Sequence, residues 1–288
     1  MQRIRLRYTK RGRLRFTSHR DFQRAFERAL RRAEVPMAYS AGFTPHPKVS
    51  YANAAPTGTG SEAEYLEIAL TEARDPDKLR DLLDESMPVG LDIIEAVEAR
   101  TSGLADRLTA SVWELRLDGV DPAEAERAVE AFKAADAVEV QRKTKNGMRT
   151  FDARAAVASL EASSGSSTAA SSEASSEASS GTSSETNSPQ ADRSSDQACA
   201  ILRLVVRHVT PAVRPDDVLS GLRAVADLAP PVAAAVTRLA QGLFDEETGT
   251  VTDPLAPDRE AVMAVPPSHE EAVAASAAAK APVPEGPA

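Results

Sequence analysis

Residues 3–34, RIRLRYTKRGRLRFTSHRDFQRAFERALRRAE, decide the fold of the first part of the chain. Between residues 3 and 8 apolar side chains alternate with arginines, which is typical of a half-buried β-strand. The alternation resumes at residues 14–16 after a turn signal at Gly12. From residue 19 onwards apolar residues recur every three or four positions, as on one face of a helix. The stretch therefore predicts a basic β-hairpin followed by a helix over 19–34.

Two signals set the ends of this helix. Ser18 is followed three positions later by Asp21, a spacing that resembles a capping box, and Pro36 stops the helix at its other end. Beyond it, the periodicity predicts a short strand near residues 37–40 and, further along, the strand 64–70, the helix 77–86 and the strand 91–97. This β-α-β-β-α-β order is that of a ferredoxin-like unit.

A weaker version of the same pattern follows. Strands are expected at 112–117, 137–143, 148–152 and 201–209, and helices at 122–134 and 216–228. Asn146-Gly147 is a strong hairpin signal between two of these strands. We therefore expect an α+β fold with two ferredoxin-like units in tandem, a basic unit over residues 1–105 and a second α+β unit over 106–244.

Two segments are too polar or too rich in Pro to fold. Residues 161–198 contain fifteen serines among thirty-eight positions, so we expect a disordered Ser-rich insert within the second unit. Residues 245–288 are rich in Pro, Ala and Glu and show no amphipathic period, so they are expected to be a disordered tail.

The charge is unevenly distributed. The chain of 288 residues has a formal net charge of -9, yet residues 1–50 hold eleven Arg and two Lys against three acidic residues. An acidic protein with a basic end suggests a surface that binds a polyanion. The alternative is that these charges only form solvated faces.

Several classes of protein are excluded or disfavoured. The lone Cys199 rules out an intramolecular disulfide or a cluster held by three thiolates of this chain, and its apolar neighbours suggest a core residue. No metal-binding, P-loop or hydrolase motif is present, so we expect no metal and no cofactor. The N-terminus lacks the apolar run of a signal peptide and no segment is long enough to span a membrane, so we expect a soluble, cytoplasmic protein with no membrane partner.

The arginines of the first fifty residues fall on two predicted surfaces. Guanidinium groups suit phosphate because their planar fork donates two hydrogen bonds to its oxygens. We therefore expect nucleic acid to bind one stripe along the helix and one open face of the hairpin, formed by Arg20, Arg24, Arg28, Arg31 and Arg32 and by Arg5, Arg7, Arg13 and Arg15. The alternative for the hairpin arginines is that they pack over the second unit and pair with its acids.

A third feature is the loop between residues 39 and 51. Pro45 and Pro47 flank His46 and hold its backbone extended, so His46 and Lys48 are presented from a stiff segment beside Phe43. Imidazole, ammonium and aromatic groups together suit a nucleotide, and the histidine could also act as a general acid or base. The alternative is a tight connection that His46 merely caps.

His19 lies in the first turn of the predicted helix, where the positive end of the helix dipole disfavours its charged form. It could serve as a neutral donor or acceptor. The alternative is a helix-terminus residue without a further role.

Three motifs in order resemble a known family. KRGRLRFTSHRD (10–21), RALRRA (28–33) and YSAGFTPHPK (39–48) are similar to the bacterial radical-SAM-linked domain of unknown function, most strongly over residues 1–100 and more loosely to about residue 230. Members of that family are encoded beside, or fused behind, a radical SAM protein. The resemblance implies a radical SAM protein as partner and supplies no catalytic residues. This chain lacks the radical SAM half, and one cysteine cannot hold that enzyme's iron-sulfur cluster.

Three hypotheses follow. The first is a non-catalytic accessory protein that binds RNA for a partner enzyme. The second is a metal-independent endoribonuclease in which His46 or His19 acts as general base on a ribose 2′-hydroxyl. The third is a protein-interaction scaffold whose basic face meets an acidic protein.

Overall fold

The computed structural model describes residues 1–145, 147–165 and 198–263, which form two compact units. The first unit comprises Met1–Ala54, Ala63–Leu108 and the described residues from Thr252 onwards. The second comprises Ala55–Glu62 and Thr109–Val251. Both combine helices with a β-sheet, so the predicted α+β class is confirmed. None of the helices within the described residues is both long and apolar enough to cross a membrane.

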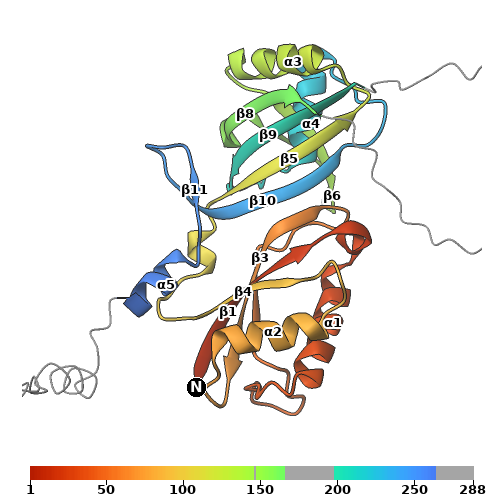
Figure 1. Ribbon diagram of the computed structural model, residues 1–288. Helices are drawn as coiled ribbons and strands as arrows, with labels where there is room; N and C mark the ends of the chain where they lie inside the picture. Colours follow the sequence, from red (N-terminus) through yellow and green to blue (C-terminus); the bar gives the residue numbers. More distant parts are fainter. Residues whose placement is uncertain (146, 166–197, 264–288) are drawn as a thin grey trace, which may run out of the picture. The chain divides into compact units, whose positions relative to one another are not determined.

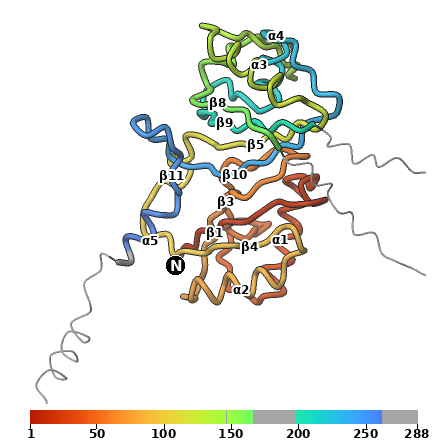
Figure 2. Tube along the Cα trace, turned by 45° about the horizontal axis from the view of Figure 1, so that its top comes forward, coloured from red at the N-terminus to blue at the C-terminus, as the bar shows by residue number. Residues whose placement is uncertain are grey.

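The first unit follows the predicted β-α-β-β-α-β order (Figure 1). In its sheet β1 lies between β4 and β3 (Figure 2). The strand β2 pairs with the other side of β3. The elements in chain order are β1 (Gln2–Lys10), the 3-10 helix η1 (Gly12–Phe16), α1 (His19–Arg32), β2 (Val49–Ala52), β3 (Gly60–Leu70), α2 (Pro76–Ser86) and β4 (Ile93–Glu98).

The core of this unit lies between the sheet and its two helices. Ile4, Leu6 and Tyr8 of β1 point into it, and all three are at most 3% exposed. They meet Phe22 and Phe26 of α1, with the rings of Tyr8 and Phe22 stacked at 4.3 Å between centroids. The alternation read from residues 3–8 is therefore correct, and the odd-numbered arginines lie on the opposite face of the sheet.

The predicted hairpin partner at residues 14–16 is wrong. β1 is an inner strand that pairs with β4 on one side and β3 on the other, so no edge is left for a hairpin. Gly12, with φ +52°, turns the chain out of the sheet, and the backbone N–H of Arg11 donates to the carbonyl of Gly90 at 2.7 Å. Residues 12–16 then form η1, which leads directly into α1.

The predicted short strand at 37–40 is also corrected. Met37 and Tyr39 form only isolated bridges, to Leu70 and Pro47. The strand that completes the sheet is β2 at Val49–Ala52. The Pro residues between them hid this pairing, because proline is rarely found inside strands and made residues 45–51 look like loop.

The second unit has a four-stranded core sheet in the order β10-β5-β9-β8, with α3 and α4 packed on it. Gly60 and Ser61, at the start of β3, pair in parallel with β10, so this sheet is mixed. The elements are β5 (Ala110–Asp118), α3 (Pro122–Ala134), β6 (Glu139–Thr144), β7 (Gly147–Asp152), the 3-10 helix η3 (Arg154–Ala156), β8 (Val157–Ser164), β9 (Cys199–Arg207), α4 (Pro215–Ala226) and β10 (Ala235–Phe244).

β6 and β7 form the predicted hairpin, although Asn146 lies outside the described residues. Cys199 is 2% exposed, as expected of a core residue. The predicted Ser-rich insert began at residue 161, but β8 extends to Ser164 and pairs with β9; residues 166–197 of the insert lie outside the described residues.

The chain after residue 245 differs from the predicted tail. The short strand β11 (Val251–Thr252) and the helix α5 (Ala256–Met263) lie in it, and Leu255 is fully buried beside Tyr65 and Leu104 of the first unit. A single buried leucine and a few ionic contacts hold this segment, and neither leaves a periodic pattern in the sequence. Residues 264–288 lie outside the described residues.

Candidate nucleic-acid interface

Helix α1 separates its apolar and basic faces as predicted. Phe22, Phe26, Ala29 and Leu30 are buried against the sheet. Ser18 caps the helix, its hydroxyl oxygen accepting from the backbone N–H of Asp21 at 3.2 Å. The five arginines of the predicted stripe are all exposed: Arg20, Arg24, Arg28, Arg31 and Arg32.

Few groups of the protein neutralise this stripe. Arg24 lies 3.8 Å from Asp21, and both side chains are more than 60% exposed, so the pair is weak. Arg32 donates to the backbone carbonyl of Ser86 at 3.2 Å. Within the described ranges, Arg20, Arg28 and Arg31 form no ion pair. The stripe therefore presents guanidinium donors to solvent.

The 3-10 helix η1 adds to this surface. Arg13 and Arg15 are exposed, and the guanidinium of Arg15 lies 4.7 Å from the ring centroid of Phe16. Phe16 is 57% exposed, although the strand prediction had placed it on a buried face. Sequence reasoning missed this residue because only the helical turn of η1 brings an aromatic ring and two arginines to the same surface. An exposed ring beside arginines is a place where a base can stack.

The loop around His46 is a narrow two-stranded ribbon. Tyr39 and Pro47 form a bridge, the N–H of Ser40 donates to the carbonyl of His46 at 2.9 Å, and the N–H of His46 donates to the hydroxyl of Ser40 at 3.0 Å. These bonds fix the backbone on both sides of residues 41–45. The His46 backbone is therefore held in the ribbon by hydrogen bonds, and its side chain is exposed.

Three predicted residues of this loop are exposed together. Phe43 at the tip is fully accessible, and His46 and Lys48 are exposed beside it. Two grooves of the first unit meet at His46. The one toward α1 includes Glu27, Arg31 and Tyr39, and the other lies over the sheet and includes Arg3 and Lys48.

His19 lies at the first residue of α1, as predicted, and is exposed. Its ring makes an edge contact with Tyr51 at 4.8 Å between centroids, and its Nε2 lies 3.1 Å from Nε2 of Gln23. Burial, and then the charge of Glu27, raise the pKa of the Tyr51 hydroxyl above its ordinary value. His19 therefore packs on a tyrosine that stays protonated at neutral pH.

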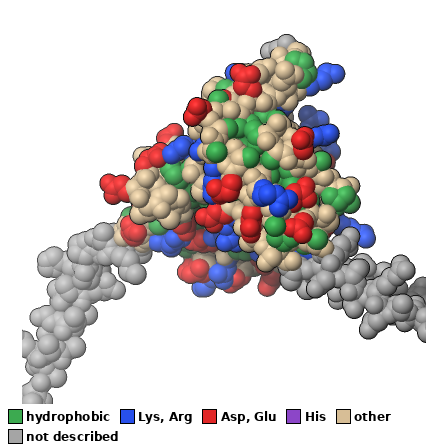
Figure 3. Space-filling view, turned by 90° about the horizontal axis from the view of Figure 1, so that it is seen from above, with side chains coloured by type: hydrophobic (Ala, Val, Ile, Leu, Met, Phe, Trp, Pro, Cys, Tyr) green, Lys and Arg blue, Asp and Glu red, His purple; other side chains and the backbone are tan. Residues whose placement is uncertain are grey.

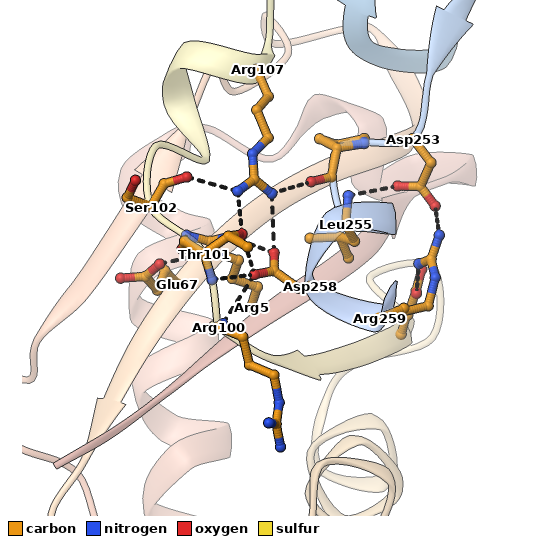
Figure 4. Close-up of polar contacts among 12 residues, drawn as sticks. Arg5, Glu67, Arg100, Thr101, Ser102, Arg107, Asp253, Leu255, Asp258 and Arg259 are labelled. Atoms are coloured by element: carbon orange, nitrogen blue, oxygen red, sulfur yellow. Dashed lines mark hydrogen bonds and ion pairs between the residues drawn. The ribbon is translucent and has the colours of Figure 1, made fainter. Parts of the chain in front are cut away.

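Arg5 does not lie on an open face, contrary to the prediction. It is 2% exposed and lies in a cluster of polar side chains built around Asp258 of α5 (Figure 4). Its Nε donates to Glu67 at 3.0 Å, its Nη2 donates to the carbonyl of Thr101 at 2.7 Å, and its Nη1 is paired with Asp258. The reason is that residues 253–263, expected to be a tail, cover this part of the sheet.

Asp258 is the centre of that cluster and is completely buried. Besides Arg5, it accepts from Nη1 of Arg107 at 3.1 Å, from the N–H groups of Arg100 and Thr101 at 3.0 and 2.9 Å, and from the Thr101 hydroxyl at 2.6 Å (Figure 4). Burial alone would raise the pKa of this carboxyl, but the hydrogen bonds from Thr101 and the contacts with Arg5 hold it below its ordinary value. Arg5 and Asp258 are thus a structural pair.

Arg7 is half-buried and lies opposite Glu95 in the register of β1 with β4. It is less accessible than the arginines of α1 and η1. Of Arg5, Arg7, Arg13 and Arg15, therefore, only Arg13 and Arg15 are exposed, and they belong to η1.

On the face drawn in Figure 3, acidic and basic side chains are interspersed among hydrophobic ones. Among the residues that the structure describes, no group of three His, Cys, Asp or Glu side chains is placed to hold a metal ion.

Fold and surface together define an α+β protein with an arginine-rich face on its first unit. Residues 3–215 match the family model described as uncharacterized protein conserved in bacteria (DUF2344), and the chain belongs to this family. No curated protein matches the sequence.

Proposed function

We propose that this protein is an accessory RNA-binding protein that holds RNA through the arginine face of its first unit. The observation that supports this proposal is the set of seven exposed arginines on two consecutive elements, Arg13 and Arg15 of η1 and Arg20, Arg24, Arg28, Arg31 and Arg32 of α1. Phosphates of a nucleic acid backbone are the polyanion that so many planar donors fit best.

The aromatic residues favour RNA over an acidic protein as the partner. Phe16 is exposed beside Arg15, and Phe43 is exposed in the loop that carries His46 and Lys48. Proteins that bind single-stranded nucleic acids combine a basic surface with aromatic rings on which bases stack. An acidic protein could pair with the arginines, but only a nucleic acid supplies phosphates for the arginines and bases that stack on the rings within the same strand.

We further propose that the partner enzyme is a radical SAM protein, as the resemblance to the radical-SAM-linked family implies. Cys199 is the chain's one cysteine and is buried, so this chain alone cannot ligate the iron-sulfur cluster of such an enzyme. Copurification of the two proteins from cells, with and without nuclease treatment, tests whether RNA connects them.

We also interpret both units as ferredoxin-like. The first has the strand order β4-β1-β3-β2 expected for that fold. The second has the matching order β10-β5-β9-β8, if the hairpin β6–β7 is an insertion between α3 and β8. The proposed RNA surface then lies on the first helix of the first unit and on the turn that precedes it.

The decisive experiment is filter binding of RNA over a series of salt concentrations. The variant Arg24→Gln/Arg28→Gln should bind all RNA sequences more weakly, and the slope of log K against log salt should fall by roughly 1.4, at about 0.7 per lost phosphate contact. The matched control is Arg127→Gln/Arg223→Gln, which removes the same charge from exposed positions of α3 and α4. Absence of RNA binding, or equal effects of the two variants, would contradict the proposal.

A further inference from the structure

A groove of about 200 Å³ lies between α1 and the His46 ribbon in the first unit. Its apolar lining includes Leu30 and Met37, both buried side chains of the core, and Tyr39, which is 55% exposed. Its polar lining includes Glu27 and Arg31 of α1 together with His46. The groove thus brings buried apolar side chains, one tyrosine and three polar side chains together in a space the size of a single base.

We propose that this groove takes one unpaired guanine of an RNA strand whose phosphates lie on the arginines of α1. The inference rests on the proposed RNA binding and adds that the substrate is single-stranded and that one base is read. In an RNA duplex the Watson–Crick edge of each base is occupied by pairing and the major groove is too deep and narrow for side chains, whereas an unpaired base can be splayed out and stacked on an aromatic ring.

Glu27 is the residue that indicates a nucleobase as the ligand of this groove. It is an acid within the arginine stripe, where it weakens the attraction for phosphate, and its carboxylate forms no ion pair with another described residue. A carboxylate accepts hydrogen bonds and donates none. The Watson–Crick edge of guanine presents two adjacent N–H donors, so Glu27 can accept both at once, while Arg31 one helical turn later can donate to the flanking phosphate.

The groove is formed before any ligand enters. The ribbon is closed by the two hydrogen bonds between Ser40 and His46, and Pro45 and Pro47 restrict the backbone on each side of the histidine. Because these contacts already fix the wall opposite α1, binding a base there costs little ordering entropy. His46 lines the groove and is exposed, so it can contact a nucleotide that flanks the bound base.

Fluorescence anisotropy with labelled RNAs of equal length tests the inference. The probes are an oligouridine strand, the same strand with one central guanosine, and a fully paired duplex. We expect the guanosine strand to bind roughly fivefold or more tightly than oligouridine, the ratio that one bidentate base contact supports. Glu27→Gln should abolish this preference, and the loss of its charge should leave binding of oligouridine equal or slightly tighter.

Glu34→Gln is the matched control, because Glu34 is an exposed acid just beyond α1 that does not line the groove. It should keep the preference for guanosine. Tyr39→Leu removes the aromatic wall while keeping an apolar side chain and should also abolish the preference. Equal binding of both single strands, or binding of the duplex as tight as that of the guanosine strand, overturns the groove as a base site but leaves RNA binding standing. No binding of any probe overturns both proposals.

Discussion

Replacing Asp258 by Ala should destabilise the first unit strongly. The substitution removes the carboxylate that neutralises Arg5, and Arg5 is 2% exposed, so its charge stays buried with Glu67 as the remaining acid bonded to it. It also removes the acceptor of two backbone N–H groups and of the Thr101 hydroxyl. Breaking a buried ion pair by removing one partner costs about 3–5 kcal/mol.

The tyrosines and the tryptophan report the two units separately. All four tyrosines, at positions 8, 39, 51 and 65, belong to the first unit, and the single tryptophan, Trp113, belongs to the second. Urea unfolding followed by near-ultraviolet circular dichroism of tyrosine and by tryptophan fluorescence therefore measures each unit. The tyrosine transition of Asp258→Ala should move to lower urea by an amount equivalent to about 3–5 kcal/mol.

Glu98→Ala is the control, since the Glu98 and Arg100 side chains are 37% and 35% exposed and their ion pair should contribute about 1 kcal/mol or less. The double variant Arg5→Met/Asp258→Ala should recover part of the loss, because it no longer buries an unpaired charge. If Asp258→Ala shifts the tyrosine transition no more than Glu98→Ala does, residues 253–263 do not hold the sheet in the way described.

The Asp258 carboxyl also makes the stability of the first unit depend on pH. Its pKa lies below the ordinary value of 3.8 in the folded protein, so its contribution to stability is complete above that pH and is lost as pH falls through the lower folded-state pKa. Asp258→Asn should therefore flatten the loss of first-unit stability under acid, which urea midpoints measured across the acid range will show.

Two further predictions concern the aromatic and histidine side chains of the first unit. The pKa of Tyr51 is raised above the ordinary 10.0, so its contribution to stability is present below that pH and is lost as pH rises; in an absorbance titration of tyrosine ionisation, Tyr51→Phe should remove one group that titrates above the ordinary value. If the protein cleaves RNA, labelled RNA should be shortened in the presence of a chelator, and His46→Ala or His19→Ala should stop it; intact RNA with the unchanged protein excludes the endoribonuclease hypothesis.

Local signals predicted the helix and its surface well. α1 begins at His19 because Ser18 caps it, and its faces separate because the apolar spacing matches the helical period. The start of α1 and the separation of its two faces both depend on residues within four positions of each other, so both can be predicted from the local sequence.

Pairing between distant strands could not be predicted in this way. Residues 14–16 alternate as a strand would, but β1 already has two neighbours in the sheet, β4 and β3, that lie far away in the sequence. Likewise β2 was hidden by nearby prolines, and β10 left no alternation strong enough to be recognised. Phe16 became part of the candidate site only because the hairpin did not form.

Arg5 and Arg24 show why residue type and local spacing do not assign a role. Each lies in a basic stripe opposite an apolar face, and each fits phosphate equally well by chemistry. A residue 253 positions further along the chain, Asp258, converts Arg5 into a buried structural group, whereas no such segment covers Arg24, which is about two-thirds exposed. A binding loss in an Arg5 variant would therefore report unfolding, and only the arginines of α1 and η1 can report contact with RNA.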